Sequence, residues 1–87
     1  MANYKIEITS TAEKSLKKIP KKDLKKVVEA IQVLAISPFP SGCRKLKGEE
    51  DVYRVRQGNY RIIYEVIDNK LIVLVLKIGH RKDIYKK

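Results

Sequence analysis

One stretch of the sequence decides the fold: Tyr53-Arg54-Val55-Arg56-Gln57-Gly58-Asn59-Tyr60-Arg61-Ile62-Ile63-Tyr64. Its two halves are rich in β-branched and aromatic residues, and they flank Gly58-Asn59, a pair suited to a two-residue hairpin turn with glycine first. That turn pairs Gln57 with Tyr60, Arg56 with Arg61, Val55 with Ile62 and Arg54 with Ile63. Because side chains alternate between the two faces of a strand, the register gives the hairpin one basic and one apolar face. The basic face holds Arg54, Arg56 and Arg61, and the apolar face holds Tyr53, Val55, Ile62 and Tyr64.

The sequence before the hairpin predicts a strand and two helices. Residues 4–8 alternate between polar and apolar, which favours a half-buried strand. Ser10 and Glu13 have the spacing of a capping box, so the first helix should begin at Ser10 and end before Pro20. Apolar residues three and four apart predict a second helix over about residues 21–36.

The remaining elements are strands. A surface loop is predicted over residues 37–42, where prolines cannot continue a helix. Strands are predicted over residues 52–56 and 60–67 and, after a tight turn at 68–70, over 71–76. The last strand has apolar residues on both of its faces, so it should lie in the middle of the sheet and be covered on both sides. The order β-α-α-β-β-β describes an α+β fold in which two amino-terminal helices pack on a mainly antiparallel four-stranded sheet.

The composition limits what such a chain can be. Its 87 residues, 44% of them hydrophobic, allow one domain over residues 1–87 with a small core. A net charge of +10 favours a polyanionic partner. One cysteine, Cys43, and one histidine, His80, make neither an internal disulfide nor the usual zinc site, so we expect no metal and no cofactor. A cytoplasmic location is expected, because the chain shows no signal peptide and no apolar run of membrane-spanning length.

The three arginines on one hairpin face point to an anionic ligand. Like charges directly opposite each other destabilise a sheet, whereas guanidinium groups offer phosphate a permanent charge and a planar fork of donors. The alternative is that the arginines only solvate an open sheet face. The scarcity of carboxylates of the same parity, with Glu65 the one exception, disfavours that alternative.

More polar chemistry follows the last strand, in Lys77-Ile78-Gly79-His80-Arg81-Lys82-Asp83-Ile84-Tyr85. Attack of an RNA 2′-hydroxyl on the neighbouring phosphate needs a proton acceptor, a proton donor and stabilisation of charge. Arg81 is suited to stabilise charge, and Tyr85 or His80 to move protons. The alternative is that His80 and Tyr85 are ordinary surface residues near the chain end.

These motifs together resemble the RelE branch of the RelE/ParE toxin superfamily. The resemblance rests on Lys45-Leu46-Lys47-Gly48, Tyr53-Arg54-Val55-Arg56, Gly58-Asn59-Tyr60-Arg61-Ile62-Ile63-Tyr64 and Gly79-His80-Arg81-Lys82-Asp83-Ile84-Tyr85. It implies a toxin of a type II toxin-antitoxin system. Such a toxin is a ribosome-dependent endoribonuclease, or mRNA interferase, that cuts messenger RNA in the ribosomal A site, leaves a 2′,3′-cyclic phosphate and inhibits translation. The catalytic residues implied by the resemblance are Arg54, Arg56, Arg61, Arg81 and Tyr85.

The resemblance leaves the general base open, because some relatives carry lysine where this chain has Arg54 and Arg56. In one assignment, neighbouring arginines favour the deprotonated form of Tyr85, which takes the 2′-hydroxyl proton, while another cation or the ribosome assists departure of the 5′-oxygen. In the other assignment, His80 moves a proton. We favour the first, because the histidine of other branches does not map clearly onto His80.

A second basic set surrounds Pro20. Lysines lie on two helices with few nearby carboxylates, and given the resemblance we expect them to contact ribosomal RNA phosphates. The alternative is a solvated helix face. The predicted RNA-binding residues are Lys14, Lys17, Lys18, Lys21, Lys22, Lys25, Lys26, Arg44, Lys45 and Lys47.

The resemblance also implies partners. It implies binding to the 70S ribosome and mRNA, and a cognate antitoxin that forms a heterotetramer with the toxin and carries the complex to promoter DNA. Ile36, Phe39 and the edge of the amino-terminal strand are the predicted antitoxin contacts, with simple core packing as the alternative.

Two other functions compete with this one. A ParE-type toxin would inhibit DNA gyrase and cut no RNA, but members of that branch lack the full set of arginines and tyrosine. A non-enzymatic basic module would bind RNA or the ribosome by charge alone.

Overall fold

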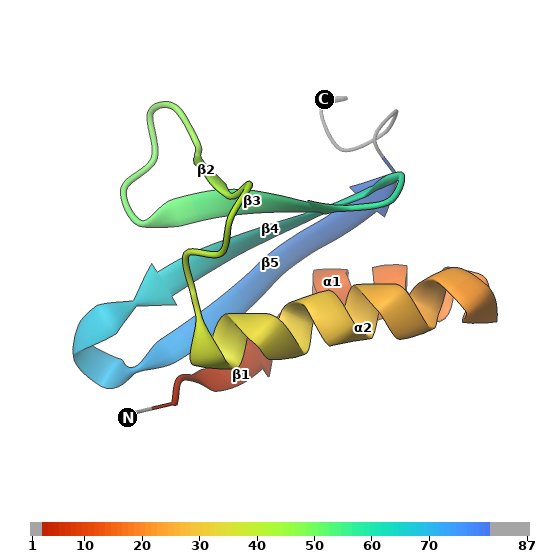
Figure 1. Ribbon diagram of the computed structural model, residues 1–87, viewed down its shortest axis with the longest axis horizontal. Helices are drawn as coiled ribbons and strands as arrows, with labels where there is room; N and C mark the ends of the chain where they lie inside the picture. Colours follow the sequence, from red (N-terminus) through yellow and green to blue (C-terminus); the bar gives the residue numbers. More distant parts are fainter. Residues whose placement is uncertain (1–2, 81–87) are drawn as a thin grey trace.

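The computed structural model describes residues 3–80, which form a helical layer on one face of a sheet (Figure 1). The helices are α1 (Ser10–Lys17) and α2 (Lys21–Ile36). The strands are β1 (Lys5–Ile8), β2 (Arg44–Lys45), β3 (Val52–Gln57), β4 (Tyr60–Ile67) and β5 (Ile72–His80), and a 3₁₀ helix, η1 (Asp68–Lys70), joins β4 to β5. The predicted α+β class, with two amino-terminal helices packed on the sheet, is confirmed.

The sheet has the strand order β1-β5-β4-β3-β2, with β1 parallel to β5 and all other pairs antiparallel. The prediction of four strands is wrong by one. The fifth, β2, pairs only Arg44 with Arg54 and Lys45 with Tyr53. Two exposed basic residues have no strand pattern of their own, so β2 exists because the adjacent edge of β3 offers it hydrogen bonds.

Strand β5 lies inside the sheet, between β1 and β4, as predicted. Its coverage on both faces is only partly as predicted. Val73, Val75 and Ile78 are buried, whereas Leu74 is half-buried. The reason is that the helices cover one face of the sheet, and no helix of residues 3–80 covers the other.

The hairpin of β3 and β4 has the predicted register, from Arg54 opposite Ile63 to Gln57 opposite Tyr60. Gly58 has a φ of +61°, a left-handed value that the first central position of this turn demands and that glycine adopts without strain. The sequence therefore predicts this part of the molecule residue by residue.

Helix α1 is capped one residue earlier than predicted. Its N-cap is Thr9, whose Oγ1 accepts a hydrogen bond from the Ala12 amide at 3.1 Å, and Ser10 is the first helical residue. The Thr9 hydroxyl also donates to the Leu76 carbonyl of β5 at 2.8 Å. This bond to a residue distant in sequence ties the start of α1 to the sheet and favours Thr9 over Ser10 as the cap.

The core joins the helices to the apolar face of the hairpin. Tyr64 is completely buried, and its ring stacks on Tyr53, which contacts Phe39 edge to face. The Tyr64 hydroxyl donates to the buried Pro38 carbonyl at 2.7 Å. Burial is the main reason that the pKa of Tyr64 is raised. Tyr64 thus holds the loop that follows α2 against the sheet.

We expect Tyr64→Phe to lower the free energy of unfolding by about 1–2 kcal/mol, because the Pro38 carbonyl stays buried without its donor. A raised pKa favours the neutral phenol in the folded state. The wild type should therefore lose stability as the pH rises above about 10, and the variant should lose less. Urea denaturation at pH 7 and pH 10.5 measures both effects. Tyr53→Phe, which leaves the bond to Pro38 in place, is the control, and equal midpoints for Tyr64→Phe and the wild type would contradict the prediction.

Candidate functional site

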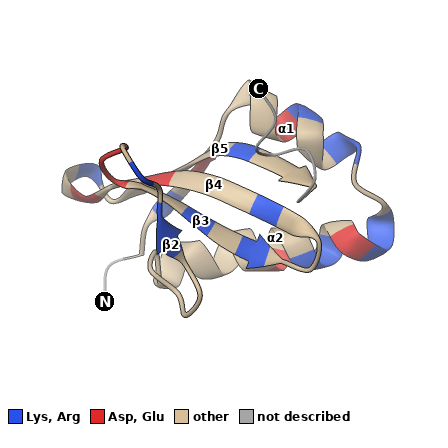
Figure 2. Cartoon of the chain, turned by 90° about the horizontal axis from the view of Figure 1, so that it is seen from above, with Lys and Arg blue, Asp and Glu red and all other residues tan. Residues whose placement is uncertain are grey.

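The face of the sheet away from the helices carries a cluster of cations, which we call the cationic face: Arg44, Arg54, Arg56, Arg61 and Lys77. Arg44 lies directly opposite Arg54, and Arg56 directly opposite Arg61. Figure 2 shows the corresponding basic segments of β2, β3, β4 and β5 as neighbours across the sheet. The predicted grouping of Arg54, Arg56 and Arg61 is therefore present, and with Arg44 the cationic face contains two opposed arginine pairs.

The register arranges these residues in two rows. One row runs Arg44, Arg54, Ile63, Lys77, and the other runs Arg56, Arg61, Gly79. Neighbouring strands lie about 4.8 Å apart, so the basic side chains of both rows share one small area. Glu65, opposite Val52, is the carboxylate that strands β2 to β5 place on this face. The area keeps a strong positive charge.

Burial differs within the cationic face. Arg54 and Arg61 are half-buried, with Nε atoms closed to solvent, whereas Arg56 is exposed. Partial burial restricts these two side chains and weakens the screening of their charge by water. Beside Arg54 and Arg56 lies a depression of about 540 Å³, lined by residues 41–44 and 54–56. An open, dense group of guanidinium ions of this kind is suited to bind a phosphate and to stabilise extra negative charge on it.

Lys77 is a site residue that the sequence analysis did not identify. It is exposed and lies opposite Ile63, on the same face as Arg54. The predicted strand ended at Leu76, and an irregularity in the pairing of β4 with β5 between Ile63 and Tyr64 changes which residues of β5 face outward. The signal in the sequence was the alternation of Lys77 with apolar Ile78, because neighbouring residues of a strand face opposite sides of the sheet.

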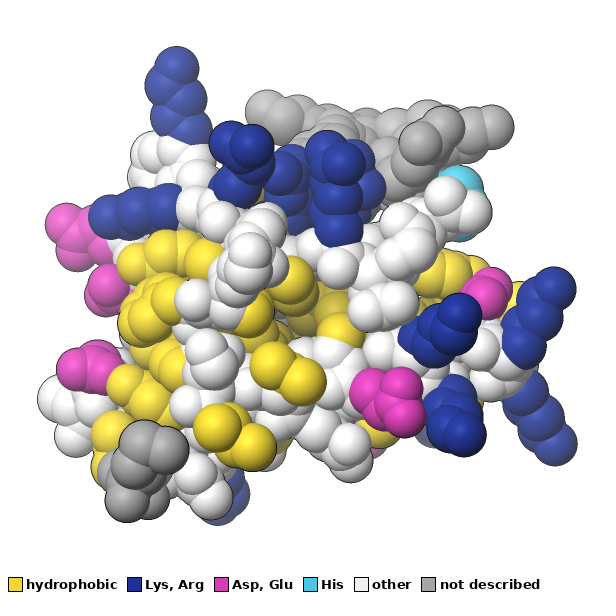
Figure 3. Space-filling model, in the orientation of Figure 1, with side chains coloured by type: hydrophobic (Ala, Val, Ile, Leu, Met, Phe, Trp, Pro, Cys, Tyr) yellow, Lys and Arg dark blue, Asp and Glu magenta, His cyan; other side chains and the backbone are white. Residues whose placement is uncertain are grey.

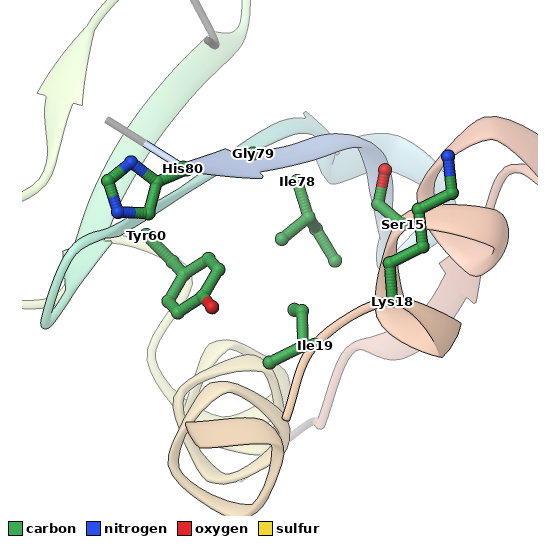
Figure 4. Close-up of a pocket in the computed structure, with 7 residues that line it drawn as sticks. All are labelled: Ser15, Lys18, Ile19, Tyr60, Ile78, Gly79 and His80. Atoms are coloured by element: carbon green, nitrogen blue, oxygen red, sulfur yellow. The ribbon is translucent and has the colours of Figure 1, made fainter. Parts of the chain in front are cut away.

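His80 lies on the helix side of the sheet. It is paired with Tyr60, and the two rings meet edge to face with their centroids 5.7 Å apart. Figure 4 shows both rings on one side of a cavity that Ser15 and Ile19 also line. The structure therefore does not bring His80 together with the arginines of the cationic face. Arg81 and Tyr85, the other predicted residues of this segment, lie outside the described residues.

The helix lysines form the second basic group. All of the lysines predicted to bind RNA on and between the two helices are exposed: Lys14, Lys17, Lys18, Lys21, Lys22, Lys25 and Lys26. The other predicted RNA-binding residues, Arg44, Lys45 and Lys47, are also exposed and lie in or just after β2. Figure 3 shows basic side chains over the upper strands and, separately, around the corner between α1 and α2. The structure thus separates two cationic surfaces.

Residues 3–80 contain neither a cluster of metal-ligating side chains nor a helix that could span a membrane. No three His, Cys, Asp or Glu side chains of this part of the chain gather closely enough to hold a metal ion. None of its helices is long and apolar enough to cross a membrane.

Comparison with known proteins gives consistent similarities over nearly the whole chain. A family model described as the ParE toxin of type II toxin-antitoxin systems matches residues 6–85. The toxin RelG of Mycobacterium tuberculosis is 33% identical over 85 residues, which cover 97% of this chain and 98% of RelG. The mRNA interferase toxin RelE of Escherichia coli is 33% identical over 78 residues, which cover 87% of this chain and 70% of that toxin. The archaeal RelE-RelB complex of Pyrococcus horikoshii contains a chain that matches with a TM-score of 0.82 at 30% identity, covering 93% of this chain and 98% of that one.

The opposed arginine pairs give a testable effect on stability. We expect Arg56→Gln to raise the free energy of unfolding by about 0.2–1 kcal/mol, because it removes a like charge directly opposite Arg61. The gain should shrink between 0.05 M and 0.5 M salt, since salt screens the repulsion. Urea denaturation at both salt concentrations measures the effect. A loss of stability at low salt would contradict the proposed repulsion.

Proposed function

The chain belongs to the family of ParE toxins of type II toxin-antitoxin systems, in which its relatives carry RelE names, and we propose that it is a ribosome-dependent endoribonuclease of the RelE kind. Its reaction would be the cleavage of messenger RNA in the ribosomal A site. The observation that supports this most directly is the cationic face, where opposed arginines are gathered on an open surface that a strand of RNA can reach.

The proposed reaction needs no group from outside the RNA except proton carriers. The 2′-oxygen loses its proton to a base and attacks the adjacent phosphorus, the bond from phosphorus to the 5′-oxygen breaks, and that oxygen takes up a proton. The products are a 2′,3′-cyclic phosphate and a 5′-hydroxyl. The phosphate gains negative charge on the way, and Arg54, Arg56 and Arg61 would stabilise it. Lys77 extends the same face and would hold a neighbouring phosphate.

The proton carriers follow from the resemblance to RelE toxins. We assign Tyr85 as the base and Arg81 as a further stabilising cation. The departing 5′-oxygen would receive its proton with the help of another cation or the ribosome. His80 is the weaker candidate, because its ring lies with Tyr60 on the helix side of the sheet.

The ribosome would supply what this small domain lacks. A single nucleotide on an open face would be held only by its phosphate, so the ribosome would have to position the rest of the message. The exposed lysines around Pro20 are suited to hold ribosomal RNA phosphates, which leaves the cationic face for the message. A toxin that acts on ribosomes would work in the cytoplasm, which is the location we propose.

A cognate antitoxin is the proposed protein partner, because several structural relatives are toxin-antitoxin complexes. Ile36 and Phe39 are 66% and 52% exposed, which fits a contact with an apolar segment of a partner. We propose that the two proteins form a heterotetramer that binds promoter DNA through the antitoxin. Strand β1 is an edge strand and offers a second contact.

Catalytic variants test the nuclease. In single-turnover cleavage of messages bound to purified ribosomes, Arg61→Gln should slow the reaction by about 10²–10³-fold, as loss of a charge-stabilising donor usually does. Arg81→Gln and Tyr85→Phe should have similar effects, whereas Lys77→Met should cost roughly tenfold, the value of one charged hydrogen bond.

Lys70→Met, which removes an exposed charge on η1, is the matched control and should cleave normally. Primer extension after induction in cells distinguishes the rival functions. Cuts at fixed codon positions support the nuclease, and DNA damage without cuts supports gyrase inhibition. If neither cuts nor DNA damage are found, the non-enzymatic basic binding module is supported. Normal cleavage by Arg61→Gln, Arg81→Gln and Tyr85→Phe would remove this active site.

Helix variants test the second surface. We expect a combined Lys21→Gln, Lys22→Gln and Lys25→Gln variant to bind vacant ribosomes more weakly and with less salt dependence. Each lost phosphate contact should reduce the slope of log K against log salt by about 0.7–0.9. The cleavage rate at saturating ribosome should not change. Lys5→Gln, an exposed change on β1, is the control, and an unchanged slope in the triple variant would contradict this role.

A further inference from the structure

A cavity of about 340 Å³ opens on the helix side of the sheet, at the corner where α1 ends beside the ends of β4 and β5. Figure 4 shows Tyr60 and His80 on one side of it and Lys18 with Ser15 on the other. Its floor is made by the buried side chains of Ile19 and Ile78. The cavity therefore lies between the helix lysines and the end of the sheet, and it does not share a side chain with the cationic face.

The residues that line the cavity are suited to bind a planar ring with polar groups at its edge. Tyr60 and His80 offer aromatic surfaces that meet edge to face, and the isoleucine floor is apolar. The hydroxyls of Ser15 and Tyr60 add hydrogen-bonding groups. The volume lies in the range of small-molecule pockets, about 300–1,000 Å³, and is ample for one nucleobase.

The charge around the cavity favours a ligand attached to phosphates. Lys18 lines it directly, and Lys14, Lys17, Lys21 and Lys22 are exposed on the same two helix ends. Among residues 3–80, no carboxylate lines it. An aromatic pocket beside a row of cations is the arrangement with which proteins bind unpaired nucleotides, in which the base stacks and the phosphates lie on lysines.

We propose that this pocket holds one unstacked base of an RNA strand whose phosphates lie on the lysines at the corner of α1 and α2. The proposal rests on the proposed function in one respect, namely that the partner of these lysines is RNA. Because the pocket and the cationic face lie on opposite sides of the sheet, the captured base belongs to a different RNA segment from the cleaved phosphate. The pocket is therefore a docking site that orients the toxin, and the reaction takes place elsewhere.

The test uses the full-length chain and two nine-nucleotide single-stranded RNAs that differ only at the centre, one with adenine and one with an abasic ribose. Base stacking contributes about 1–3 kcal/mol per base, so the wild type should bind the adenine RNA roughly tenfold more tightly. His80→Ala, which removes one ring, should bring the ratio of the two dissociation constants close to one. Ser15→Leu fills the cavity from the helix side with both rings in place, and it should have the same effect.

Lys17→Gln is the matched control, because it removes a charge from the same helix without touching the lining. It should weaken both RNAs equally and keep the ratio. A ratio near one in the wild type, or a ratio that survives both His80→Ala and Ser15→Leu, would overturn the proposal. If the cavity instead takes an antitoxin side chain, Ser15→Leu will weaken antitoxin binding and leave the RNA ratio intact, which also overturns it.

Binding to vacant ribosomes identifies the source of the base. If Ser15→Leu loses as much affinity for vacant ribosomes as it loses for the adenine RNA, the captured base belongs to ribosomal RNA. If its ribosome affinity is normal while its preference for the adenine RNA over the abasic RNA is lost, the captured base belongs to the message. Cleavage of ribosome-bound message by the wild type is measured in parallel. A wild type that keeps the tenfold ratio but cuts nothing would support the pocket and contradict the nuclease, so the two hypotheses fail separately.

Discussion

The register of the β3–β4 hairpin is the constraint on which both faces of the molecule depend. Gly58 closes the hairpin with two residues, which places Arg56 opposite Arg61 and Val55 opposite Ile62. A slip by one residue would turn every side chain to the other face and drive arginines into the core, where an uncompensated charge is strongly destabilising. The apolar face therefore fixes the register, and the cationic face follows from it. Packing on the apolar face thus positions the residues of the proposed active site on the opposite face.

Strand β5 extends this dependence to the segment that carries the most varied chemistry. Lys77 pairs with Ile63 on the open face, whereas His80 pairs with Tyr60 on the helix side. Four consecutive residues thus serve two surfaces of one sheet. A motif that is continuous in sequence, from Lys77 to His80, is divided in space by the alternation of a strand. This is why closeness in sequence to Lys77 does not make His80 a member of the cationic face.

Local patterns made the hairpin and α2 predictable, and long-range partners decided the rest. The turn at Gly58-Asn59 and the apolar stripe over residues 21–36 specify their own elements, so their bounds followed from the sequence. The cap of α1 did not, because Thr9 is selected by a bond to Leu76. Strand β2 did not, because it depends on β3 for its pairing. Within the site, the alternation of side chains along the hairpin made Arg54, Arg56 and Arg61 predictable. Lys77 was missed because the predicted strand ended at Leu76, whereas β5 continues to His80 past an irregularity in its pairing with β4.

The excess of positive charge connects stability with binding. Two pairs of arginines face each other directly across strands in a small domain whose net charge is +10, so the folded state contains a built-in repulsion. Any anion that binds the cationic face relieves this repulsion and stabilises the fold by mass action. RNA phosphate and an acidic segment of a protein partner would relieve the same repulsion at the same place, and they therefore exclude each other. An antitoxin of opposite charge that covers this face would inhibit the toxin and stabilise it through one interaction. The helix lysines lie on a separate surface and are not subject to that competition. If they dock the toxin on the ribosome as we propose, a partner that covers only them would weaken docking and leave the cationic face accessible.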